Sequence, residues 1–82
     1  MRFLLAALVA TSLHGAFAFD GAATVKQYDH ARPGCRQNEL DGQPISQAES
    51  AKQCDILAKL GKELKDNGYC WSATEQEWAV CK

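Results

Sequence analysis

The sequence lacks the short motifs that commonly mark an enzyme active site. It has no G-x-S-x-G nucleophile turn, no H-E-x-x-H zinc helix and no C-x-x-C dithiol pair. Zinc sites usually take their ligands in closely spaced pairs, and only His30 accompanies the well-separated cysteines after residue 18. We therefore expect no catalytic residue, no metal and no cofactor.

A surplus of basic charge is also missing. The chain has 9 Lys and Arg against 10 Asp and Glu, a formal net charge of −1, and removing the first 18 residues takes away only Arg2. General nucleic-acid binding and cationic membrane lysis both need a concentrated basic surface. We expect neither activity, and no nucleic acid among the partners.

Only one long apolar run is present, from Phe3 to Leu13. Arg2 precedes it, and Ala16-Phe17-Ala18 follows with the small-x-small form of a signal-peptide cleavage site. The run is shorter than the roughly 20 residues that span a bilayer. We predict a secretory signal peptide over residues 1–18 and one mature domain over residues 19–82. The domain is then secreted and extracellular, with no membrane anchor; the alternative is a buried N-terminal helix.

Four cysteines follow the leader: Cys35, Cys54, Cys70 and Cys81. A secreted domain this small usually depends on disulfides, and each contributes about 2–4 kcal/mol. If a C-terminal hairpin runs back along a helix, Cys70 and Cys81 meet at its open end, far from Cys54. We therefore favour Cys35–Cys54 with Cys70–Cys81. A hairpin that crosses the helix steeply favours the interlaced pairing of Cys35 with Cys81 and Cys54 with Cys70.

The strongest local signal predicts a helix from about residue 47 to residue 66. Ser46 and Glu49 form a capping box at its start, and Asn67-Gly68 supplies the stop. Between these signals an apolar stripe recurs at helical spacing: Cys54, Leu57, Leu60, Gly61 and Leu64.

A β-hairpin is predicted from Tyr69 to the C-terminus, with Cys70 opposite Cys81, Trp71 opposite Val80 and Ala73 opposite Trp78. Residues 24–30 have moderate strand character. The segments 31–34 and 41–42 contain turn-forming residues. The fold class that follows is α+β, with one helix packed on a small antiparallel sheet and two disulfides.

Three aromatic residues in the hairpin are candidates for binding: Tyr69, Trp71 and Trp78. Such side chains anchor interfaces and stack on sugars or bases. The favoured interpretation is that the tryptophans form the core, because a domain this small needs their rings for packing.

Two polar pairs are interpreted as solvated surface rather than as catalytic groups. They are Asp29 with His30, and Glu75 with Glu77. No nucleophile or oxyanion motif stands near either pair.

The segment SQAESAKQCDILAKLGKELKDNGYCWSATEQEWAVCK resembles the layout of killer-toxin-like and Hce2-type fungal proteins. In those, a cysteine-bearing helix precedes a glycine and an aromatic strand. With its leader, small mature domain and even cysteine number, the chain is similar to small secreted cysteine-rich fungal effectors and toxins. The resemblance implies activity directed at a host or a competitor, as in virulence, and names no target.

We therefore expect a secreted binding protein, an effector that docks a rigid surface on an extracellular or host protein. It is expected to be monomeric and not an enzyme. The alternatives are a secreted toxin or antimicrobial protein, and a small hydrolase inhibitor that uses the loop from Asn38 to Pro44.

Overall fold

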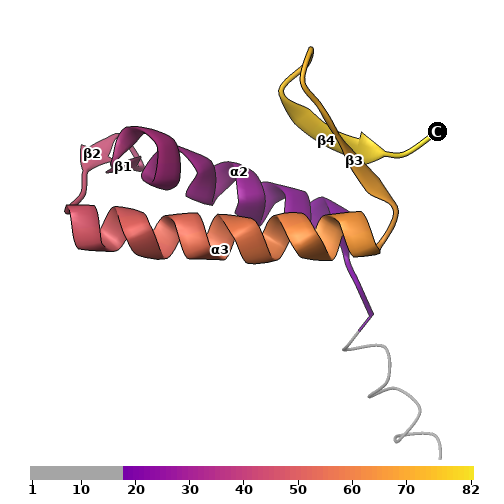
Figure 1. Cartoon of the computed structure of the whole chain (residues 1–82), viewed down its shortest axis with the longest axis horizontal. Helices are drawn as coiled ribbons and strands as arrows, with labels where there is room; N and C mark the ends of the chain where they lie inside the picture. The colour runs from indigo at the N-terminus through magenta and orange to yellow at the C-terminus, as the bar shows by residue number, and fades with distance from the viewer. Residues whose placement is uncertain (1–17) are drawn as a thin grey trace, which may run out of the picture.

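Two antiparallel helices lie side by side, and a short β-hairpin stands at each end of the pair (Figure 1). The computed structural model describes residues 18–82, so the predicted signal peptide lies outside the described residues except for Ala18. In chain order the elements are α2 (Gly21–Gln37), β1 (Glu39–Leu40), β2 (Gln43–Pro44), α3 (Gln47–Asp66), β3 (Tyr69–Ser72) and β4 (Glu77–Val80). The α+β class is confirmed, and residues 18–82 form two helices and two separate two-stranded sheets.

Helix α2 corrects the prediction of a strand over residues 24–30. Asp20 caps the helix, since its side chain accepts a hydrogen bond of 3.0 Å from the main-chain N–H of Ala23. Thr24, Ala31 and Gly34 are buried at helical spacing. The β-branched residues that suggested a strand therefore lie in helix α2, which runs alongside α3 in Figure 1.

The turn predicted over residues 31–34 is also wrong, because these residues continue α2. Pro33 removes one helical hydrogen bond, and packing against α3 keeps the helix intact. A Cβ atom at Gly34 would come within 2.7 Å of Gln53 Cγ, so the two helices approach closely here. Ser50 Oγ, which is buried, donates a hydrogen bond of 2.7 Å to the Gly34 carbonyl.

The β1–β2 hairpin contains the predicted turn at Asp41-Gly42. Both residues have positive φ, 51° and 77°, as a type I′ turn requires. At the open end of this hairpin, next to the helices, the Ile45 N–H donates a hydrogen bond of 2.9 Å to the Asn38 carbonyl. Helix α2 therefore passes into α3 through a short hairpin with a two-residue turn.

Helix α3 has the bounds that the sequence predicts. Ser46 Oγ accepts a hydrogen bond of 3.0 Å from the Glu49 N–H at its start. At its end Gly68 takes a positive φ of 87°. Of the predicted stripe, Gly61 and Leu64 are buried, and Cys54, Leu57 and Leu60 are half-buried.

The C-terminal hairpin is confirmed, but its predicted register is wrong. Trp71 pairs with Trp78 and Cys70 pairs with Ala79. The turn takes four residues, 73–76, rather than two, and Gln76 adopts a positive φ of 56° within it. The longer turn shifts the pairing while leaving both tryptophans on one face of the hairpin.

Both predicted disulfides are present. Cys35–Cys54 joins α2 to α3 with a Cα–Cα distance of 4.5 Å. Cys70–Cys81 closes the open end of the β3–β4 hairpin with a Cα–Cα distance of 5.0 Å. Each half of the domain therefore has its own covalent link, and the interlaced pairing is not found.

The core is small and lies where the hairpin meets the helices. Its most buried apolar side chains are Ala31, Leu64 and Trp78, with Leu64 fully buried. The Tyr28 ring of α2 packs against both tryptophans, with centroids 5.8 Å from Trp71 and 5.3 Å from Trp78. Among residues 18–82, no helix combines the length and the apolarity that a membrane crossing requires.

Candidate functional site

The three predicted binding aromatics take different places. Trp78 is only 8% exposed and contacts Tyr28 and Trp71, so it belongs to the core. Its indole N–H is buried and has no hydrogen-bond partner among the described residues. Tyr69 is half-buried and packs edge-on against Phe19, with centroids 6.0 Å apart. Trp71 is also half-buried, and a binding role for these aromatics remains a prediction.

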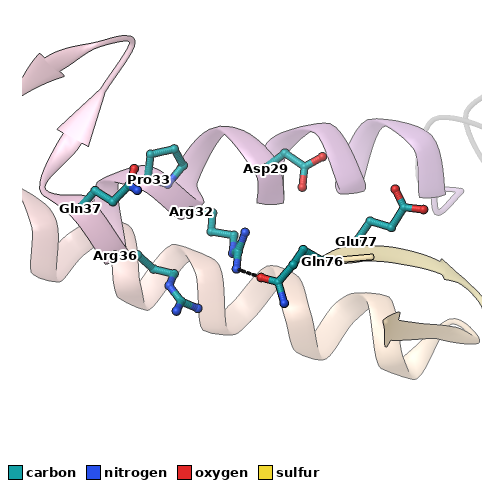
Figure 2. Close-up of a pocket in the computed structure, with 7 residues that line it drawn as sticks. All are labelled: Asp29, Arg32, Pro33, Arg36, Gln37, Gln76 and Glu77. Carbon is teal, nitrogen blue, oxygen red and sulfur yellow. Dashed lines mark hydrogen bonds between the residues drawn. The ribbon is translucent and has the colours of Figure 1, made fainter. Parts of the chain in front are cut away.

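A polar groove separates the outer face of α2 from the turn of the β3–β4 hairpin; we call it the tip groove (Figure 2). Its volume is about 470 Å³, within the range of ordinary ligand sites. It is lined by Asp29, Arg32, Pro33, Arg36, Gln37, Gln76 and Glu77.

Arg32 joins the two walls of the tip groove. Its guanidinium donates a hydrogen bond of 2.6 Å to Gln76 Oε1, drawn as the dashed line in Figure 2. The same group lies 5.1 Å from the centre of the Trp71 ring, a cation–π contact. A guanidinium has five N–H donors, so most of those on Arg32 stay available to a ligand.

Gln76 is held tightly on the hairpin side. Its main-chain N–H donates to the Ser72 carbonyl at 2.7 Å, and its side-chain amide donates to the Ala73 carbonyl at 2.8 Å. The left-handed backbone is strained for a residue with a side chain, and costs on the order of 1 kcal/mol. In this left-handed conformation, the Gln76 amide oxygen lies within hydrogen-bonding distance of the Arg32 guanidinium.

The charged groups of the tip groove are not neutralised by one another. Arg36 follows Arg32 by one helical turn, and Asp29 and Glu77 lie in the same lining. Within residues 18–82, none of these four side chains takes part in a salt bridge. Two cations and two carboxylates thus face solvent in one groove, ready to bind groups of opposite charge.

Two other polar pairs lie on the exposed surface of the described chain. His30 Nε2 lies 3.2 Å from Asp41 Oδ1 at an exposed site, which ties α2 to the β1–β2 turn. A hydrogen bond to Asp66 raises the pKa of Lys62 on the exposed surface of α3. No group of three or more His, Cys, Asp or Glu residues that could hold a metal occurs between residues 18 and 82.

Arg32, Arg36 and Gln76 were not among the residues singled out from the sequence. The two arginines share a helical face only if residues 21–37 form a helix. The sequence features that indicate this helix are Asp20 as its N-cap and the helical spacing of Thr24, Ala31 and Gly34. The contact from Arg32 to Gln76 spans 44 residues, and no local pattern indicates it.

Comparisons of the chain with known protein families, with curated proteins and with solved structures give no match.

Proposed function

We propose that the protein is a secreted binding protein, an effector that acts on a host or competitor by docking a rigid surface on an extracellular protein. The observation that carries the proposal is the tip groove, whose walls are the outer face of α2 and the β3–β4 turn. A surface fixed before binding loses little conformational freedom when a partner docks.

Two features support this function over others. The disulfides Cys35–Cys54 and Cys70–Cys81 are the kind of bonds that persist in an oxidising extracellular compartment. Each one also restrains an element that contributes to the tip groove, the first α2 and the second the β3–β4 hairpin. The chemistry of the groove lining, with exposed charges and no nucleophile paired to a base, suits recognition rather than bond cleavage.

The experiment is a capture assay with the oxidised mature protein, residues 19–82, coupled to a resin and exposed to extracellular fluid of a candidate host. The matched control is the same protein after reduction and alkylation of its four cysteines. A single protein enriched on the oxidised resin, whose binding is then reproduced with the purified partner in calorimetry, supports the proposal. Equal recovery on both resins contradicts a folded docking surface.

A further inference from the structure

The geometry of the tip groove points to the chemistry of its ligand, and this inference rests on the proposed function. We propose that the groove binds a peptide segment in which a side-chain carboxylate lies close to a lysine or arginine. The carboxylate is held by Arg32 and Arg36, and the cationic side chain lies beside Asp29 and Glu77. The partner is therefore recognised by neighbouring charges of opposite sign rather than by a single charge.

The basic end of the groove has the donors that a carboxylate requires. Arg32 and Arg36 extend from α2 to the same side, as Figure 2 shows. The Arg36 guanidinium has no hydrogen bond to any described residue, and the Arg32 guanidinium donates only to Gln76. Arginine binds carboxylates through parallel N–H groups, and these charge-assisted bonds are about twice as strong as neutral ones.

The acidic end of the groove, formed by Asp29 and Glu77, limits which anions can bind. Asp29 precedes both arginines on α2, and Glu77 begins β4. Two carboxylates in the lining of one groove repel a polyanion such as a nucleic acid or a sulfated polysaccharide. They attract a cation on the same ligand, so the lining favours a segment with charges of both signs.

The length of the groove fits a short stretch of extended chain. Asp29 and Arg36 are seven residues apart in α2, which corresponds to roughly 10 Å along the helix axis. In an extended peptide, residues two apart point to the same side and are roughly 7 Å apart. A glutamate and a lysine in that relation, with their flexible side chains, reach both ends of the groove.

Arg32, one of the two arginines at the basic end, is held in place before any ligand arrives. Arg32 is stacked on Trp71 and tied to Gln76, and Gln76 is itself held by Ser72 and Ala73. Ordering a free arginine side chain on binding costs rotamer entropy, which weakens the affinity for the ligand. The structure has already restrained one of the two arginines.

The test is an NMR titration of oxidised residues 19–82 with a defined peptide, acetyl-Gly-Glu-Gly-Lys-Gly-amide. The side-chain Nε–H signals of Arg32 and Arg36 and the indole signal of Trp71 are followed. Saturable shifts with a Kd of about 1 mM or lower are expected. Arg36→Gln should weaken binding about tenfold, the effect of losing one charge-assisted hydrogen bond. Lys59→Gln, an equal charge loss on the exposed surface of α3, should leave the Kd within about twofold.

Four comparison ligands make the result decisive. The peptide with Gln in place of Glu should fail to shift the arginine signals, and the peptide with Gln in place of Lys should bind more weakly. Inorganic phosphate and a heparin oligosaccharide should bind more weakly than the Glu–Lys peptide. Tighter binding of heparin would overturn the proposal in favour of a polyanion site, and unsaturable shifts with every ligand would overturn it outright. Neither result alters the capture assay, so the failure of this inference and of the proposed function can be told apart.

Discussion

Ser50 Oγ donates a hydrogen bond of 2.7 Å to the main-chain carbonyl of Gly34, across the interface of α2 and α3. The bond is buried, and it exists because glycine lets the two helix backbones approach. Pro33 and Cys35 flank Gly34, so a close approach of the helices, the helix-weakening proline and the interhelical disulfide occupy three consecutive residues. This junction sets the position of the outer face of α2, which carries Arg32 and Arg36.

Gly34→Ala should destabilise the domain by about 1–3 kcal/mol, the usual cost of overpacking. The new methyl group would lie 2.7 Å from Gln53 Cγ and 3.0 Å from Leu40 Cδ2, so the helices must separate. Gly61→Ala is the matched control, because its nearest neighbours stand at 3.6 Å, ordinary van der Waals contact. That change should be neutral or stabilising by up to about 1 kcal/mol through helix propensity. Urea denaturation measures both, and equal effects would contradict the close approach at Gly34.

Trp78→Ala should destabilise the domain by about 3–5 kcal/mol, enough to unfold a chain of this size. Trp78 is 8% exposed and contacts Tyr28 and Trp71. Trp78→Phe should lower the free energy of unfolding by less than the loss of buried side-chain area suggests. The reason is that this change also eliminates the buried indole N–H, which has no partner among the described residues. Val80→Ala, at a residue 65% exposed, is the control. A folded Trp78→Ala variant in circular dichroism would contradict the core role.

The parts of the fold with local signals could be predicted from the sequence, and the parts that depend on distant contacts could not. Ser46, Glu49 and Gly68 mark the ends of α3 within a few residues of chain. At Pro33-Gly34 the local signal favours a turn, but Gln53 and Ser50, far along the chain, hold the segment helical. Tertiary packing overrides weak local preferences in this way.

The tip groove could not be predicted from the sequence either, because it depends on contacts between distant parts of the chain. It needs α2 to bring Arg32 and Arg36 onto one face, and it needs the four-residue turn that gives Gln76 its positive φ. The predicted two-residue turn would have shifted the register, with Cys70 opposite Cys81 instead of Ala79. The disulfide pairing was still predicted correctly, because Cys70 and Cys81 lie at the open end of the hairpin in either register.

Trypsin digestion of the unreduced protein should separate the two disulfides into different fragments. Cleavage after Lys65 releases residues 66–82, which contain Cys70 and Cys81 and no internal lysine or arginine. This fragment should appear closed on itself by mass spectrometry. Residues 27–36 should be found linked to residues 53–59 through Cys35–Cys54. A fragment that joins 66–82 to either of the others would contradict the pairing.

The proposed cleavage after Ala18 makes Phe19 the first residue of the mature protein. Phe19 is half-buried, packs on Tyr69 and directly precedes the Asp20 cap of α2, so the mature chain would begin at its first packed side chain. Phe19→Ala should lower the free energy of unfolding by about 1 kcal/mol through loss of the aromatic pair.

Phe17→Ala, two residues earlier in the chain, is the control that tests the cleavage position itself. Because cleavage after Ala18 discards residue 17, the secreted product of this variant should have the same intact mass and the same unfolding curve as the parent. The Phe19→Ala product should instead be lighter by the difference between phenylalanine and alanine. A mass change in the Phe17→Ala product would show that residue 17 is retained, and the mature chain would then begin before the residue that packs on Tyr69.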